Sequence, residues 1–271
     1  MSSIIRWHEL MKLRIDGFEE NLPKFLEDKV RLREFCAEHK INTSDIITQF
    51  SNPESIDLNI IKENSFVIKP SLDSSTRGVM VLNRTETEDK FFDVLHNRLF
   101  TLNEIKEYQR KFFIENTHKE NKIIVEKKIE DIDSSYIIPR DFKFYSFNGK
   151  IALILIIDRN RKPAISCWYD EDFQPIYNGI VECMAPYTRT LTYYTRPNNF
   201  KNLMDFASKV SKLIRVPFAS IDVYSTEAGP LLGEITLTPG GIYYGEHYIL
   251  SKAQEKLMGR MWLEAKEELK L

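Results

Sequence analysis

The strongest local constraint in this sequence is an alternating segment that ends at Asn148-Gly149. Residues 141–147 are Asp-Phe-Lys-Phe-Tyr-Ser-Phe, and this period of two is that of a β-strand whose two faces differ in polarity. An Asn-Gly pair favours a tight turn with positive φ angles, and the apolar residues 151–157 that follow can form the return strand. The pattern therefore predicts a β-hairpin, and with it a fold that contains antiparallel sheet.

Other segments predict further strands and several helices. Runs rich in β-branched and aromatic residues lie at 65–70, 78–82, 122–129, 218–224 and 231–237. Apolar spacing favours helix at 8–39 with an interruption near Pro23, at 86–118 and at 199–214, whereas the polar segment 40–64 predicts irregular structure. The balance predicts an α+β protein with largely antiparallel sheets.

Length and charge limit the classes of protein to consider. A chain of 271 residues is expected to form one large domain or two tightly joined lobes. The 38 Lys and Arg nearly balance the 40 Asp and Glu, so no whole-molecule field would attract nucleic acid or an anionic membrane. No run approaches the ~20 apolar residues of a membrane-spanning helix, and the N-terminus lacks a signal-peptide stretch. We expect a cytoplasmic protein with no nucleic-acid partner and no membrane insertion.

The cysteines are few and far apart. Cys36, Cys167 and Cys183 are odd in number and do not form a Cys-x-x-Cys pair. This spacing argues against a disulfide framework and against a zinc site. We expect all three to be small buried apolar side chains.

Two carboxylates lie inside apolar runs near the C-terminal end of the sequence. Asp222 follows Ala-Ser-Ile, and Glu234 begins the run Glu-Ile-Thr-Leu-Thr-Pro-Gly-Gly after a short turn. On adjacent strands the two side chains would meet across the ladder, and burying both is costly unless a cation compensates them. Magnesium binds carboxylate oxygens together with nucleotide phosphates, so the pair is a candidate magnesium site. The alternative is that each carboxylate faces solvent on a half-exposed hairpin.

Lys69 ends an apolar strand and precedes a loop of small residues. The loop from Ser71 to Arg77 includes Ser74 and Ser75, and its hydroxyl and amide groups suit a phosphate tail. The Gly-x-x-x-x-Gly-Lys order of a P-loop is absent. A nucleotide-binding loop that acts as a lid is one hypothesis, and a surface hairpin is the other.

Residues 125–129, Val-Glu-Lys-Lys-Ile, lead from a strand into an acidic stretch that contains Asp133. Backbone groups here could receive an adenine edge, and a carboxylate could bind ribose hydroxyls. A solvated run of charges is the alternative.

Lys143 and Arg159 lie on, or just after, the two arms of the predicted hairpin. They could direct positive charge at the same site, because a planar guanidinium suits a carboxylate or phosphate and an ammonium is a point charge. The alternative is two exposed strand charges.

Taken together and in this order, the segments resemble the ATP-grasp superfamily and, within it, the TupA-like family named for teichuronopeptide biosynthesis. The resemblance runs from about Asp28 to the C-terminus. It rests on the ordered series Asp28-Lys29, Arg33-Glu34-Phe35, Phe66 to Pro70, Val125-Glu126, Asp141 to Lys150, Asp158-Arg159, Tyr169-Asp170 and Gly233 to Gly241.

The resemblance implies an ATP-grasp fold, in which two α+β lobes bind a nucleotide between them. Lys29 and Lys69 match the lysines of the family that reach adenine and phosphate. Glu126 and Lys127 match the hinge that receives adenine, and Ile129 would offer a backbone group. We expect a short helical N-terminal region at 1–60, the small lobe at 61–125 and the large lobe with the metal site at 126–271.

The resemblance also assigns the metal ligands. Asp222 and Glu234 match the magnesium ligands, and Thr236 stands where many ATP-grasp enzymes have a metal-binding Asn. Ser220 stands where the family usually has an Arg that steadies the acyl phosphate. The residues that could replace its charge are Lys143, Arg159 and Arg215.

The activity implied is an ATP- and Mg²⁺-dependent ligase that forms a C–N bond through an acyl phosphate. The resemblance points to an amino acid or small amine joined to a uronic acid or acidic peptide, in cell-surface polysaccharide or polymer biosynthesis. Three alternatives stay open: an ATP-dependent kinase, a non-catalytic ATP-binding regulatory module, which the departure at Ser220 keeps open, and a purely structural protein. Residues 1–60 are shorter than the substrate domain of many such ligases, so we allow for a homodimer or a partner protein that presents the acceptor.

Overall fold

The computed structural model describes residues 5–72, 76–87, 89–113, 121–176, 179–184, 196–245 and 247–271. The chain forms two compact units. The first combines Met1–Glu27 with Pro139–Leu271, and the second, Asp28–Ile138, is inserted between these two parts in the sequence. The three-segment division given above stays a prediction.

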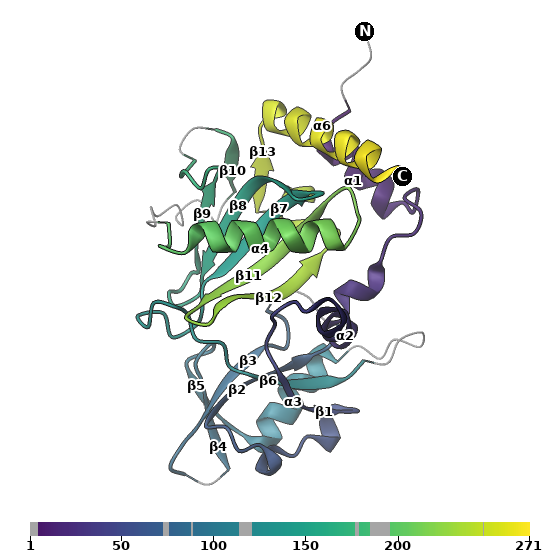
Figure 1. The fold of residues 1–271 in the computed structure, drawn as a ribbon. Coiled ribbons are helices and arrows are strands. Elements are labelled where there is room, and N and C mark those ends of the chain that lie inside the picture. The colour runs from purple at the N-terminus through teal and green to yellow at the C-terminus, as the bar shows by residue number, and fades with distance from the viewer. Residues whose placement is uncertain are drawn as a thin grey trace. The chain divides into compact units, whose positions relative to one another are not determined.

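The inserted unit is built on a six-stranded antiparallel sheet with the order β1-β6-β2-β3-β4-β5 (Figure 1). Its strands are β1 (Ile46–Phe50), β2 (Ser65–Pro70), β3 (Met80–Arg84), β4 (Lys90–Asp93), β5 (Arg98–Thr101) and β6 (Ile123–Lys127). Its helices are α2 (Lys29–His39), α3 (Leu102–Phe112) and the short 3-10 helices η2 (Pro53–Ser55) and η3 (Leu58–Ile60).

Local sequence explains where the two longer helices of this unit begin. The Asp28 side chain accepts hydrogen bonds from the amides of Val30 and Arg31 at the start of α2. Thr101 and Glu104 form a reciprocal capping box at the start of α3. The apolar face of α3 contributes Ile105 to a core that contains the buried side chains of β2, β3 and β6.

The other unit is built on a five-stranded antiparallel sheet with the order β12-β11-β7-β8-β9. Its strands are β7 (Asp141–Phe147), β8 (Lys150–Asp158), β9 (Ile165–Tyr169), β11 (Ala219–Thr226) and β12 (Gly229–Thr236), and β10 (Val181–Cys183) pairs with β13 (Tyr248–Leu250). Its helices are α1 (Trp7–Ile15), the 3-10 helix η1 (Lys24–Glu27), α4 (Phe200–Leu213), α5 (Gly240–Tyr243) and α6 (Lys252–Leu269).

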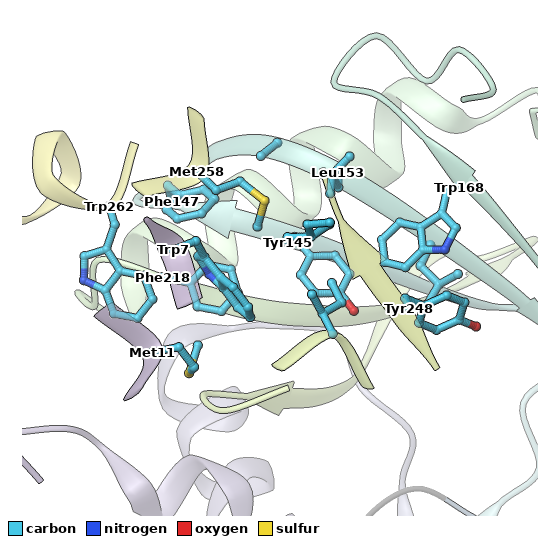
Figure 2. Close-up of a cluster of buried hydrophobic side chains, with 14 of the residues drawn as sticks. Trp7, Met11, Tyr145, Phe147, Leu153, Trp168, Phe218, Tyr248, Met258 and Trp262 are labelled. Atoms are coloured by element: carbon cyan, nitrogen blue, oxygen red, sulfur yellow. The ribbon is translucent and has the colours of Figure 1, made fainter. Parts of the chain in front are cut away.

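Helices cover both faces of the five-stranded sheet. Helix α4 lies across one face, and α1 and α6 lie side by side against the other (Figure 1). Phe218 stacks on Trp262 of α6 and meets Trp7 of α1 edge-on, and this aromatic cluster continues through Tyr145 to Trp168 (Figure 2). The remaining part of this sheet face carries charged side chains, described below.

The predicted hairpin is confirmed. Strands β7 and β8 pair across Asn148 and Gly149, whose φ angles are 46° and 91°. The strands predicted at 218–224 and 231–237 are β11 and β12, and the helix predicted at 199–214 is α4.

Two predictions about the inserted unit were wrong. The segment 40–64 contains strand β1, which lies at the edge of the sheet and pairs with β6 although four of its five residues are half-buried or exposed. The segment predicted as helix at 86–118 contains the hairpin β4–β5 before α3. Asn97 turns this hairpin with a φ of 53°, and the buried Asp93 side chain accepts hydrogen bonds from the amides of Val81 and Leu95. Such tertiary partners are not visible in apolar spacing.

Candidate functional site

Three of the predicted site residues lie in one row across the five-stranded sheet. Asp222 on β11 is the direct cross-strand partner of Lys143 on β7 and of Glu234 on β12. Directly opposed residues on neighbouring strands project to the same face, so the ammonium and the two carboxylates are grouped there. The Lys143 ammonium contacts Asp222 Oδ2 directly.

Two further charged side chains, those of Asp141 and Arg159, extend this row. Lys143 Nζ also lies 3.0 Å from Oδ2 of Asp141, two residues earlier on β7. Arg159, just after β8, donates to the same oxygen from both terminal nitrogens at 3.3 and 3.4 Å. The other carboxylate oxygen, Asp141 Oδ1, is buried and has no hydrogen-bond partner among the described residues. The sequence singled out Lys143 and Arg159, but it gave no role to Asp141, although that residue stands in the same motif.

The charges of this row perturb one another. Burial raises the pKa of Asp222 to about 7. Lys143 opposes this shift, and the carboxylates of Asp141 and Glu234 reinforce it. Burial also raises the pKa of Asp141, but Lys143 and Arg159 outweigh burial, and the pKa is lowered overall. The row therefore holds one firmly ionised carboxylate, Asp141, beside one that resists ionisation, Asp222.

The irregularity in β12 sets which side chains reach this face. The ladder pairs Asp222 with Glu234 and the next residue, Val223, with Leu232, so Gly233 is an extra residue in β12. A Cβ atom at Gly233 would lie 2.7 Å from the ring of Tyr224. Glycine thus allows the Tyr224 ring to pack over the bulge, next to the carboxylate row. Tyr224 is a site residue that the sequence did not indicate, because the bulge that admits its ring cannot be seen in a single strand.

Magnesium fits the oxygen atoms of this row. Asp222 and Glu234 supply hard carboxylate oxygens from adjacent strands, and the buried Asp141 Oδ1 is an oxygen that no protein donor satisfies in the described structure. Across the described ranges, no three His, Cys, Asp or Glu side chains form a group that could hold a metal ion by themselves. A cation at Asp222 and Glu234 therefore needs further oxygen ligands, which for magnesium are commonly waters and nucleotide phosphates.

Ser220 and Thr236 face each other two residues from Asp222 and Glu234 along the same strands. Ser220 Oγ donates a hydrogen bond to Asp222 Oδ1 at 3.1 Å. The serine thus orients the carboxylate but adds no positive charge. Arg159 is the guanidinium that the structure brings to this row.

The inserted unit holds a second group of predicted site residues. Lys69 Nζ on β2 lies 2.5 Å from Glu126 Oε2 on β6, and Arg33 Nη2 on α2 lies 2.6 Å from Glu126 Oε1. Burial raises the pKa of Glu126, but Lys69 and Arg33 outweigh burial and lower this pKa overall. Arg33 Nη1 is buried and unpartnered within the part of the chain that the structure describes. Arg33 received no role from the sequence, although its motif was noted, because its contact with Glu126 joins residues far apart in the chain.

Two of the predicted adenine-binding residues, Lys127 and Ile129, differ in whether their backbone groups are already hydrogen-bonded. The Lys127 carbonyl accepts from Ser44 Oγ at 2.8 Å, and the Lys127 amide donates to the Asp45 carbonyl at 3.0 Å. Ile129, two residues further, makes no backbone hydrogen bond within the described segments. The amide and carbonyl of Ile129 are therefore the better-placed backbone groups for a ligand, which is the role predicted for them.

The remaining predicted nucleotide residues are placed as follows. Lys29 is the first residue of α2, is 7% exposed, and donates its amide to the Ser71 carbonyl. Asp133 is exposed and accepts a hydrogen bond from the Ser135 amide in a turn after β6. Ser74 and Ser75, and with them the centre of the proposed lid, lie outside the described residues.

The N-terminal segment anchors the chain directly after Thr236. Arg14, 2% exposed, donates to the carbonyls of Phe218 and Leu237 at 2.8 Å each. The Leu237 amide donates to Glu27 Oε1 at 3.2 Å. Both backbone groups of Leu237 are therefore held by residues of the N-terminal segment.

Comparison with solved structures identifies the class of fold. A D-alanine–D-alanine ligase from Bacillus anthracis superimposes with a TM-score of 0.54 at 15% identity, over 91% of this chain and 69% of that chain. The same ligase complexed with ATP gives a TM-score of 0.51 at 14% identity, over 90% of this chain and 68% of that chain. At these identities the similarity shows the fold alone, which is that of the ATP-grasp ligases.

The family follows from the sequence itself. The model of the family described as TupA-like ATPgrasp matches residues 9–261, and the chain belongs to this family. The search of curated proteins returned no match. Within the described residues, no helix has both the length and the apolar composition needed to cross a membrane.

Proposed function

We propose that this protein is an ATP- and Mg²⁺-dependent carboxylate–amine ligase that works through an acyl phosphate. The observation that carries the proposal is the row Lys143–Asp222–Glu234 on the five-stranded sheet of a member of the TupA-like ATP-grasp family. Asp222 and Glu234, with Thr236 beside them, are the proposed magnesium ligands. Magnesium bound there would neutralise charge on the phosphates of ATP during transfer.

The residues of the chain have two tasks in this reaction. Lys29, Lys69, Glu126 and Asp133 through their side chains, and Ile129 through its backbone, bind and orient the nucleotide. The proposed nucleotide residues of the loop and hinge are Ser74, Ser75 and Lys127. Lys143 and Arg159 stabilise negative charge while a substrate carboxylate oxygen attacks the γ-phosphorus and ADP leaves. The amine nitrogen then attacks the acyl carbon, loses a proton and displaces phosphate to form the amide.

The substrates proposed are an amino acid or small amine and the carboxylate of a uronic acid or acidic peptide. Support comes from membership of the TupA-like family, which the resemblance described above connects with teichuronopeptide biosynthesis. Cell-surface polymer biosynthesis from the cytoplasm is the corresponding role.

The first experiment is thermal melting of the purified protein with Mg-ATP and with ATP plus a chelator. At ATP about a hundredfold above its dissociation constant, binding adds ~2–3 kcal/mol and raises Tm by several degrees. We expect this increase to require magnesium and to be lost in Asp222→Asn and Glu234→Gln. Glu227→Gln, which removes an exposed carboxylate at the tip of the β11–β12 hairpin, is the matched control and should keep it.

Product analysis separates ligase from kinase. Amine-dependent release of ADP together with an amide product supports the ligase. A phosphorylated acceptor without an amide would make the protein a kinase, and Mg-dependent binding without any ADP release would make it a regulatory module. No Mg-dependent shift at millimolar ATP contradicts the nucleotide site.

A further inference from the structure

Lys143 is shared between two buried carboxylates. Its ammonium contacts Oδ2 of Asp222 and lies 3.0 Å from Oδ2 of Asp141. Both aspartates are at most 4% exposed. Asp222 depends on Lys143 more than Asp141 does. Arg159 also donates to Asp141, whereas Lys143 is the one cation that contacts Asp222 in the described structure.

These five side chains do not balance in charge. When all five are ionised, the three carboxylates of Asp141, Asp222 and Glu234 exceed the two cations, Lys143 and Arg159, by one negative charge. A divalent cation at Asp222 and Glu234 reverses this excess. The ammonium would then contact the same carboxylate as the metal, and like charges so close in a buried site repel strongly.

We propose that Lys143 is an exchangeable counter-ion, displaced from Asp222 when a divalent cation binds and thereby released to pair with an anionic oxygen of the substrate. This rests on the proposed magnesium site and states how that site is regulated. A lysine suits the exchange, because its ammonium is a point charge on a flexible four-carbon stem and can move without any change in the strand. Asp141, still paired with Arg159, retains its own cation after the exchange.

The exchange makes metal and anion binding cooperative. Before the metal binds, Lys143 is held by Asp141 and Asp222 and contributes little to an incoming phosphate or acyl phosphate. Once the metal has taken Asp222, the ammonium is available to that anion. Linkage requires the reverse effect too, so a bound anion that holds Lys143 raises the affinity of the metal.

The test measures binding of Mn²⁺ alone, without nucleotide, at constant ionic strength, by the electron paramagnetic resonance signal of free Mn²⁺. Lys143→Met removes the competing charge, and a unit charge about 4 Å from a metal in a partly buried site changes affinity by roughly tenfold or more. We therefore expect Lys143→Met to bind Mn²⁺ at least about tenfold more tightly than wild type. Lys143→Arg keeps the charge and should stay near wild type. Lys209→Met removes an exposed lysine from α4, on the opposite face of the sheet, and should have no effect.

The outcomes distinguish the two proposals. Mn²⁺ binding that is equal or weaker in Lys143→Met overturns the exchange and leaves the metal site standing. No Mn²⁺ binding by wild type overturns both. If circular dichroism shows that Lys143→Met is misfolded, a crystal structure of wild type with Mn²⁺ decides: an ammonium still in contact with Asp222 beside the metal overturns the exchange, and an ammonium moved away supports it.

Discussion

Glu126 shows how a single buried carboxylate can stay ionised in this protein. It is 4% exposed, and burial by itself favours the neutral acid. Lys69 and Arg33 bind its two oxygens and lower its pKa below the ordinary value of 4.5. The ion pair therefore stabilises the folded state above pH 4.5, and this stabilisation is lost as the pH falls through the lower folded pKa.

We predict that Glu126→Gln destabilises the protein by about 3–5 kcal/mol at pH 7, because it leaves two largely but not fully buried cations without their carboxylate. The difference from wild type should shrink below pH 4.5, where wild type begins to lose the same interaction. Urea denaturation at pH 7 and at pH 3.5 measures both effects. Glu130→Gln, which removes an exposed partner of Lys128, is the control and should change stability by less than about 1 kcal/mol. An equal difference at both pH values would contradict the argument.

Helix α6 contains one glycine, Gly259, and the backbone of the N-terminal residues Ile5 and Arg6 lies directly against it. A Cβ atom at Gly259 would lie 2.1 Å from the Ile5 carbonyl oxygen and 3.1 Å from the Arg6 carbonyl carbon. These are backbone atoms, so they cannot move aside as a side chain could. The His8 amide, one turn away, donates to Glu255 of the same helix at 2.9 Å.

We predict that Gly259→Ala lowers stability by roughly 1–3 kcal/mol, because the crowding outweighs the gain of about 1 kcal/mol in helix propensity. Thermal melting measures the change. Lys256→Ala, at an exposed position of α6, tests helix propensity alone and should have little effect. A Gly259→Ala variant that melts above wild type would mean that the N-terminal segment is not held against α6.

At the scale of the whole chain, one compact unit is formed by two distant parts of the sequence, Met1–Glu27 and Pro139–Leu271. Trp7 and Met11 are fully buried, and Trp7 packs edge-on against Phe218 with ring centroids 5.4 Å apart (Figure 2). The core of this unit thus depends on contacts between the first and last parts of the sequence. Such non-local contacts form only after a long loop has closed.

We predict that Trp7→Ala destabilises this unit by about 3–5 kcal/mol, the usual cost of truncating a buried aromatic residue. Loss of near-ultraviolet circular dichroism at a lower urea concentration measures it. Phe18→Ala, which truncates a side chain that is 74% exposed in the same segment, should be close to neutral. Equal effects of the two variants would contradict the placement of Trp7 in the core.

The parts of the fold that could be predicted are those encoded locally. The hairpin β7–β8 follows from alternation and Asn148-Gly149, and the strands β11 and β12 follow from two apolar runs around a turn. The pairing of Asp222 with Glu234 could be anticipated from these strands. The family resemblance was confirmed, whereas the roles of the individual site residues stay predictions.

What escaped prediction depends on distant partners. Strand β1 is an edge strand whose pairing with β6 stabilises a polar segment. The apolar residues of strands β4 and β5 have a spacing that also fits a helix, so the hairpin could not be recognised from the spacing. Arg33 and Asp141 gain their significance from contacts with Glu126 and Arg159. No local pattern contains those contacts.

The extra residue Gly233 has a consequence for engineering and for comparing sequences. Upstream of it, Leu232 pairs with Val223, and downstream of it, Glu234 pairs with Asp222, so the glycine changes which face each half of β12 presents. A deletion of Gly233 would make Leu232 and Glu234 adjacent, and regular alternation would still place these two side chains on opposite faces. What the deletion would remove is the bulge over which the Tyr224 ring packs. In aligning this strand with a relative, the alternation of faces must therefore be counted separately on the two sides of Gly233, because the bulge places Leu232 on the same face as Ile235, three residues away.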